Sequence, residues 1–175
     1  MRSRLGGIVA LAGLALAACA NGREEGRPTM TFATPSFSDG AAMPATYTCD
    51  GENKNPGVSW ANVPEGAKSL VVLVEDRDAG NFPHWVVFDL PPTVTGIAEG
   101  GPPEGGKVGV NGFDKPGYGG PCPPQGRHRY SFNVFALDTV LALPDGATRD
   151  QVRGAMKGHV LARGAFMGMY QKGGA

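Results

Sequence analysis

The sequence lacks the features that mark several large classes of protein. Its 175 residues hold 16 basic and 16 acidic side chains, so the formal net charge is 0. Such a chain lacks the basic surface on which nucleic-acid binding depends. With only 3 cysteines and 3 histidines, it contains no Cys-x-x-Cys pair and no closely spaced histidines. We therefore expect no nucleic-acid partner and no structural zinc site, and the sequence implies no metal or cofactor.

Long apolar runs are also missing, and the one near the N-terminus is short. Arg2 and Arg4 precede an uncharged stretch, residues 5–18, that is rich in Ala, Leu and Gly. This is the layout of a secretory signal peptide rather than of a permanent membrane helix. The closing sequence Leu16-Ala-Ala-Cys19 resembles the lipobox of bacterial lipoproteins, which implies that Cys19 carries a lipid and anchors the chain to a membrane. The alternative is an ordinary cleaved signal followed by a chance cysteine.

The chain divides into three predicted parts. Residues 1–18 are the signal peptide, and residues 19–29 have no apolar pattern, which suits a flexible tether. Residues 30–175 are long enough for one domain with a sizeable core. Loss of Arg2 and Arg4 with the signal leaves 14 of the 16 basic residues against 16 acidic ones, a net charge of −2 before histidines. We expect an exported protein, lipid-anchored to the cell envelope and facing the periplasm. Ala20 after the lipobox favours the outer membrane if the cell is Gram-negative.

The body of the chain consists of short apolar runs separated by turn residues, with 28 Gly and 15 Pro in all. Residues 70–74 form a continuous apolar, Val-rich run, typical of a strand that is buried on both faces. Residues 85–88 form a second run a short loop later. We expect the two to pair as an antiparallel hairpin.

The second half of the chain adds further strands and a helix. Residues 129–137 alternate, which places His128, Tyr130 and Phe132 on one side of a strand and Arg129 on the other. Thr148 can cap a short helix within residues 147–158, and a last strand is expected in residues 159–170. The pattern predicts a mostly β fold: two antiparallel sheets in a Greek-key-like sandwich, with one or two short helices.

Polar residues gather at the ends of the first two predicted strands. The run 70–74 continues into Asp76 and Asp78, and His84 opens the return strand, so a hairpin places all three at one end of the sheet. An acid beside a histidine can fix its tautomer or raise its pKa. An acidic loop beside a hairpin is also commonly just solvated surface, and these residues alone leave both interpretations open.

A Gly- and Pro-rich segment, residues 117–126, leads directly into His128 and Tyr130. Its glycines allow the backbone to approach a ligand closely, and its prolines stiffen the loop. The N–H groups of Gly119, Gly120 and Gly126 could point into one concavity and hold an anion, while His128 and Tyr130 face the same side of their strand. The alternative is a rigid crossover loop without a ligand.

These residues resemble the signatures of the phosphatidylethanolamine-binding protein family, in particular its bacterial, Raf-kinase-inhibitor-like branch. The likeness covers nearly all of residues 31–170. Its signatures, in matching order and spacing, are Thr48–Trp60, Val74–Ala79, Pro83–Trp85, Gly119–Pro124, His128–Tyr130 and Gly158–Ala162. The family implies two antiparallel sheets with a small anion pocket, in members that bind lipid headgroups or inhibit kinases or proteases. The pocket residues carried over are Asp76, Asp78, His84, Gly120, Pro121, His128 and Tyr130.

One loop departs from the family pattern. The usual Asp-Pro-Asp-Ala-Pro is Asp76-Arg-Asp-Ala-Gly80 here, so the loop has lost two prolines and gained a cation. Both changes could loosen it or alter ligand preference.

Cys49 and Cys122 remain if Cys19 is lipidated, and in the family likeness they lie in the two segments that flank the pocket. Export would place them in an oxidising compartment, where a disulfide can persist, and we predict a disulfide between them. Their spacing alone does not exclude two buried free thiols.

The expected function is non-catalytic binding of a small anionic or zwitterionic phosphate-containing ligand, such as a phospholipid headgroup. In this hypothesis the phosphate lies on the Gly119 and Gly120 amides, His128 and Tyr130, and an aspartate pairs with the ammonium or orients His84. The alternatives are an inhibitor of a secreted protease or other extracytoplasmic protein, and an enzyme with Cys122 as nucleophile, which a disulfide would disarm. His159 follows the predicted helix with no polar cluster nearby and is not expected to bind.

Overall fold

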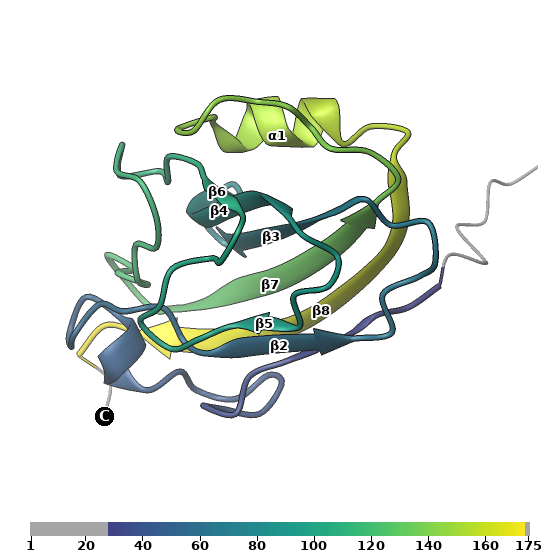
Figure 1. Cartoon of the computed structure of the whole chain (residues 1–175). Helices are drawn as coiled ribbons and strands as arrows, with labels where there is room; N and C mark the ends of the chain where they lie inside the picture. Colours follow the sequence, from purple (N-terminus) through teal and green to yellow (C-terminus); the bar gives the residue numbers. More distant parts are fainter. Residues whose placement is uncertain (1–27, 174–175) are drawn as a thin grey trace, which may run out of the picture.

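The structure is a computed structural model that describes residues 28–173. It contains two antiparallel sheets and one short α-helix, which confirms the predicted fold class (Figure 1). The three-stranded sheet has the order β1 (Thr31–Ala33), β2 (Val58–Ala61), β5 (Gly96–Ile97). The five-stranded sheet has the order β6 (Lys107–Val108), β4 (Phe82–Leu90), β3 (Ser69–Asp76), β7 (Arg127–Leu137), β8 (Val160–Gln171). A 3-10 turn, η1, spans Ala45–Tyr47. The predicted signal peptide, Cys19 and most of the predicted tether lie outside the described residues.

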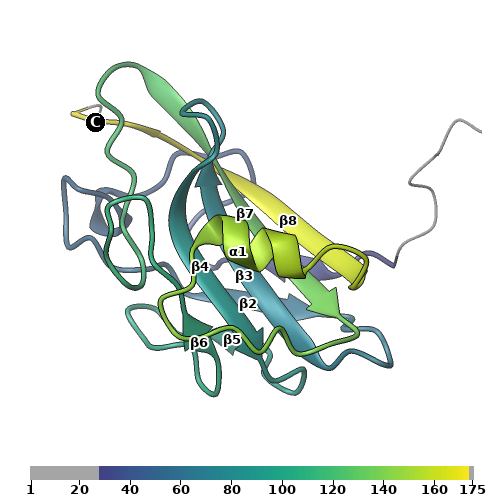
Figure 2. The same cartoon turned by 90° about the horizontal axis from the view of Figure 1, so that it is seen from above.

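The five-stranded sheet lies between the three-stranded sheet and the helix α1 (Arg149–Ala155), so the molecule has three layers (Figures 1 and 2). The predicted two-faced burial of β3 is confirmed, since all of its residues are buried. Leu70, Val72 and Val74 belong to the core between the two sheets, whereas Val71 and Leu73 belong to the core under the helix. A continuous apolar run is what a central strand between two layers requires.

The predicted hairpin and third strand are also present. β3 pairs with β4 on one side and with β7 on the other, both antiparallel. Asp76 is paired with Phe82 of β4 and with Tyr130 of β7. His84 and His128 each lie two residues from one of these partners, and alternation puts such residues on the same face. The register therefore brings Asp76 and both histidines to one end of the sheet.

The helix covers the opposite face of the same strands. Its N-cap is Thr148, as predicted. The Thr148 side chain accepts the N–H of Gln151 while the Gln151 side chain accepts the N–H of Thr148, a capping box. Below the helix, the fully buried Glu75 carboxylate accepts a hydrogen bond from Arg153 Nε at 3.1 Å. A buried carboxylate requires such a partner. Glu75 therefore fastens the helix to β3. The next residue, Asp76, faces the opposite side of the sheet.

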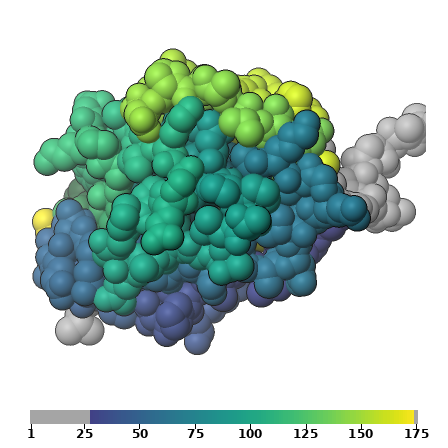
Figure 3. Space-filling model, viewed as in Figure 1, coloured from purple at the N-terminus to yellow at the C-terminus, as the bar shows by residue number. Residues whose placement is uncertain are grey.

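A long connection between β5 and β7 lies across the middle of the face seen in Figure 3. Buried Asn111 organises it, because its side-chain oxygen accepts the N–H groups of Phe113 and Lys115 and its amide donates to the Gly117 carbonyl at 3.0 Å. The connection ends in the Gly- and Pro-rich segment beside Asp76 and the histidines. Among residues 28–173, no helix is long and apolar enough to cross a membrane.

Candidate functional site

A cavity of about 190 Å³ lies at the end of the sheet where β3 leads into the turn to β4. Its polar side chains are Asp76, His84 and His128. The rest of the wall is apolar and consists of Ala79, Phe82, Phe113, Cys122, Pro123 and Pro124. Two histidines and one acid thus converge in an otherwise apolar hollow, and sites with this composition commonly bind small molecules.

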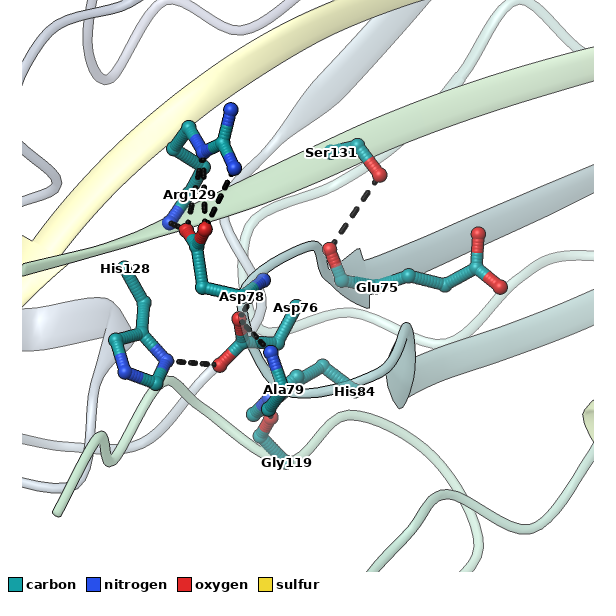
Figure 4. A network of polar contacts seen from close by, with 9 residues as sticks. All are labelled: Glu75, Asp76, Asp78, Ala79, His84, Gly119, His128, Arg129 and Ser131. Atoms are coloured by element: carbon teal, nitrogen blue, oxygen red, sulfur yellow. Dashed lines mark hydrogen bonds and ion pairs between the residues drawn. The ribbon is translucent and has the colours of Figure 1, made fainter.

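Asp76 and His128 form a hydrogen-bonded pair on the cavity wall (Figure 4). Asp76 Oδ2 lies 2.7 Å from His128 Nδ1, and the side chains are 5% and 16% exposed. The other carboxylate oxygen accepts the N–H groups of Asp78 at 2.9 Å and Ala79 at 3.2 Å. Because a carboxylate accepts, His128 Nδ1 carries a proton. Asp76 therefore orients the ring, and both of its oxygens are already engaged rather than free for a ligand.

His84 is fixed by a different contact from the one expected. Its Nδ1 lies 2.6 Å from the carbonyl oxygen of Gly119, so the ring donates to the backbone and not to an aspartate. The ring is 3% exposed and lies edge to face against Phe82, Phe113 and Tyr130 at centroid distances of 5.2, 5.6 and 5.2 Å. Burial lowers the pKa of His84 below its ordinary value, which keeps the imidazole neutral.

Tyr130 lies behind the cavity and does not line it. Its ring stacks on His128 with a centroid distance of 6.4 Å, and its hydroxyl is fully buried without a hydrogen-bond partner among the described residues. Burial, reinforced by the neighbouring Asp76 carboxylate, raises the pKa of Tyr130 far above its ordinary value. The hydroxyl therefore stays protonated, and the ring supports both histidines.

Asp78 points away from the cavity to the solvent side of β7, where it binds Arg129. Its carboxylate accepts the backbone N–H of Arg129 at 2.7 Å and the guanidinium Nη2 at 2.6 Å. Hydrogen bonds from the Arg129 side chain, then from its backbone, lower the pKa of Asp78 from 3.8 to about 2. The pair fastens the β3–β4 turn to β7, so Asp78 holds the turn that carries Asp76 and Ala79.

The glycine amides expected to hold an anion are already occupied. The Gly119 N–H donates to the His84 carbonyl at 2.8 Å, and the Gly120 N–H donates to Asn53 Oδ1 at 2.7 Å. Gly120 lines a neighbouring cavity of about 290 Å³, and Pro121 lines neither of the two. A Cβ on Gly120 would lie 2.6 Å from the Tyr47 carbonyl oxygen, so glycine is needed there for close backbone packing. This corrects the expectation that the two amides are free for a ligand.

The predicted disulfide between Cys49 and Cys122 is present, with a Cα–Cα distance of 5.4 Å. It is accompanied by a backbone hydrogen bond from the Cys49 N–H to the Pro121 carbonyl at 3.0 Å. Cys122 is part of the wall of both cavities. The cross-link therefore fixes this wall to the segment around η1, and its sulfur is not a free thiolate nucleophile.

Several residues of the cavity wall were not among the predicted binding residues. Phe82 could have been found, because it lies two residues before His84 and shares its face of the strand. Cys122, Pro123 and Pro124 belong to the predicted Gly- and Pro-rich segment, but lie just after the residues assigned to the site. Phe113 gave no local signal, since it comes from an irregular connection that only the tertiary fold brings to the cavity.

Comparison with known proteins identifies the chain's relatives. The family model described as phosphatidylethanolamine-binding protein matches residues 33–171, which includes every residue of the cavity. The chain belongs to the phosphatidylethanolamine-binding protein family. A UPF0098 protein of Methanothermobacter thermautotrophicus is 46% identical over 151 residues, which is 82% of this chain and 100% of the relative. A UPF0098 protein of Aquifex aeolicus is 45% identical over an alignment that covers 84% of this chain and 91% of the relative.

Two solved structures have the same fold. A phosphatidylethanolamine-binding protein homologue of Chlamydia trachomatis is 40% identical, with a TM-score of 0.77 over 82% of this chain and 98% of that one. E. coli YbcL, described as a new member of the mammalian family, is 30% identical, with a TM-score of 0.76 over 82% and 99%. This chain therefore shares its fold, over most of its length, with both bacterial structures.

The loop that departs from the family pattern is held by contacts that proline could not make. The Arg77 N–H donates to the Arg129 carbonyl at 2.8 Å, and a proline there would have no N–H to donate. Gly80 has a φ of +65°, which the proline ring does not allow. Both replacements therefore fit a turn that is tied to β7 by hydrogen bonds.

Proposed function

We propose that this protein is a non-catalytic, lipid-anchored receptor of the cell envelope that binds a small phosphate-containing anion in the cavity beside Asp76 and His128. Membership of the phosphatidylethanolamine-binding protein family supports this proposal. The observation that carries it is the convergence of His84 and His128 in one cavity, with Asp76 bonded behind His128.

The cavity wall contains neither Lys nor Arg, so an anion depends on weaker groups. Protonated His128 can place its positive charge between the Asp76 carboxylate and the ligand, with Nε2–H donating to an anion oxygen. Of the three loop residues in the wall, Pro123 and Pro124 have no N–H, whereas the Cys122 N–H makes none of the described hydrogen bonds. The proposed anion donors are therefore His128 Nε2 and the Cys122 amide.

The size of the cavity limits the ligand. At about 190 Å³ it is smaller than the roughly 300–1,000 Å³ that encloses a drug-sized molecule. A phosphate or phosphoethanolamine group is the scale of ligand that it suits, and the acyl chains of a phospholipid would remain outside.

Calorimetric titration with phosphoethanolamine tests the proposal. We expect binding that calorimetry detects at or below millimolar phosphoethanolamine, because His128 and the Cys122 amide can both donate to the phosphate oxygens. His159→Ala serves as a control, since it removes a histidine that does not line the cavity. Absence of binding at millimolar phosphoethanolamine in mildly acidic buffer would contradict the proposal.

The envelope location is tested separately from the binding. If Cys19 is lipidated, the expressed full-length chain should fractionate with membranes and incorporate labelled fatty acid, and Cys19→Ser should abolish both. A wild-type chain that is released without fatty acid would contradict lipid anchoring while leaving the ligand proposal intact.

A further inference from the structure

The hydrogen bond of His84 fixes which ring nitrogen faces the cavity as an acceptor. The Gly119 carbonyl can only accept, so the proton of the neutral ring lies on Nδ1, and Nε2 presents a lone pair. Nε2 takes part in none of the described hydrogen bonds. It is also not enclosed, because the Tyr130 hydroxyl is the one fully buried side-chain nitrogen or oxygen without a hydrogen-bond partner in residues 28–173. Since His84 lines the cavity, its Nε2 is the atom that a ligand would meet.

The surroundings of His84 keep this lone pair in place. The titratable groups that face it are Asp76 from β3, and His128 and Tyr130 from β7. Desolvation is the largest effect and lowers the pKa of His84, and His128 acts in the same direction. The Gly119 and Gly120 carbonyls and the Asp76 charge oppose this lowering but do not reverse it. The cavity therefore combines an acceptor, His84 Nε2, with the proposed donors at His128 and Cys122.

We propose that the cavity selects a phosphate group that still carries a proton, the monoanion of a phosphate monoester, over phosphodiesters and sulfate. This inference rests on the proposed function and specifies its ligand. The P–OH of a monoester can donate to His84 Nε2 while its other oxygens accept from His128 and the Cys122 amide. A phosphodiester or sulfate has no such proton and would place an oxygen lone pair against the nitrogen lone pair.

The energetic reason lies in the burial of His84. A bound ligand that gives a buried polar group no hydrogen bond leaves that group unsatisfied, which costs more free energy than the same loss in water. Sites built around a ligand hydroxyl therefore discriminate strongly against analogues that lack it. We therefore expect at least tenfold discrimination. Phosphoethanolamine, inorganic phosphate and a phosphomonoester lipid headgroup share the required proton, whereas the headgroup of an intact phosphodiester lipid does not.

A matched ligand series tests the inference on the unaltered protein. Methyl phosphate, dimethyl phosphate and sulfate are titrated by calorimetry near pH 5.5, where a monoester with a second pKa of about 6 is mostly monoanionic. We expect methyl phosphate to bind at least tenfold more tightly than the other two. Sulfate gains or loses no proton in this range, so its pH dependence reports the protein alone. The ratio of methyl phosphate to sulfate affinity should fall as the pH rises above about 6.

Two further measurements address His84 directly. Nitrogen NMR of labelled histidine should show the Nδ1–H tautomer for this residue in the folded protein. His84→Gln supplies a side-chain amide that can donate as well as accept, so sulfate should gain on methyl phosphate, whereas His159→Gln should leave the ratio unchanged. The NMR result does not depend on the variant folding.

The outcomes separate the two proposals. Equal affinity for the three anions, or an Nε2–H tautomer at His84, overturns the selection for a protonated phosphate and leaves anion binding standing. Failure of every anion to bind at millimolar concentration overturns the proposed function and this inference together.

Discussion

Two histidine–aspartate pairs in this protein have the same hydrogen bond and different surroundings. In both, Nδ1 lies 2.7 Å from an aspartate oxygen: His128 with Asp76, and His159 with Asp138. The first pair has side chains that are 16% and 5% exposed, the second 46% and 47%. An exposed ion pair contributes little to stability, because solvent screens it and its side chains must be ordered. In a desolvated pair, removal of one partner is strongly destabilising because it leaves the other buried and unpaired.

The two pairs teach that a bond length does not identify a site. No polar cluster was expected near His159, yet Asp138 pairs with it in the structure, which corrects that expectation. What sets His128 apart is its place in a cavity wall, the ring of Tyr130 stacked on it, and a carboxylate partner whose other oxygen is bound by the β3–β4 turn.

The largest expected effect comes from the disulfide. It lies beside the His128–Asp76 pair and, among the described residues, has no counterpart beside the His159–Asp138 pair. Replacing Cys49 and Cys122 together with alanine should lower the free energy of unfolding by about 4 kcal/mol, because the disulfide closes a loop across a sequence separation of 73 residues. Urea denaturation under non-reducing conditions measures the change, and wild-type protein treated with reductant should match the variant. Two reactive thiols in untreated exported protein would contradict the prediction.

The second largest effect should come from removal of the aspartate, which should destabilise the buried pair much more than the exposed pair. Asp76→Ala should cost about 3 kcal/mol of stability, because it leaves His128 Nδ1 and two turn N–H groups without their shared acceptor. Asp138→Ala should cost less than about 0.5 kcal/mol, as for most exposed changes. Denaturant unfolding of the two variants side by side is the measurement. Equal losses would mean that burial does not distinguish the pairs.

Removal of a cavity histidine should weaken anion binding. His84→Ala and His128→Ala should each weaken binding of inorganic phosphate by roughly 1.5–3 kcal/mol, the scale of a hydrogen bond to a charged group. His159→Ala should leave the affinity unchanged. Calorimetry on variants with native circular dichroism checks this. Three identical affinities would remove the histidines from the site and leave the Cys122 amide as the remaining proposed donor.

The sheet could be predicted from local pattern because each strand carries its own signal. The apolar run of β3, the alternation of β7 and the capping residue Thr148 each depend on neighbours in the sequence, and the structure confirms all three. The hairpin then placed Asp76 and His84 at one end of the sheet.

The pairing within the site could not be predicted in the same way. In the structure, His84 donates to the Gly119 carbonyl and His128 is the partner of Asp76. Only the tertiary fold decides which of the two rings lies beside each acceptor. The engagement of the Gly120 amide depends on Asn53, which is 67 residues away in the chain. Such contacts leave no periodic trace, so residue types in the loop pointed to the right segment but not to the atoms that face a ligand.

The last and smallest expected effect concerns Asp78, whose ion pair with Arg129 adjoins the cavity but is exposed like the His159 pair. The pKa of Asp78 is lowered from 3.8 to about 2 by hydrogen bonds from Arg129, so the carboxylate binds its proton less readily in the folded state than in the unfolded state. Its contribution to stability is therefore present in full above the unfolded pKa and is lost as the pH falls through about 2. The difference in unfolding free energy between wild type and Asp78→Asn should be constant near neutral pH and should shrink between about pH 4 and pH 2. Added salt should also reduce it, because solvent ions screen an exposed pair. Urea denaturation across this pH range measures both effects. A difference that persists at pH 2 and at high salt would show that Asp78 holds the turn through neutral hydrogen bonds, and that its charge is not what fastens the turn to β7.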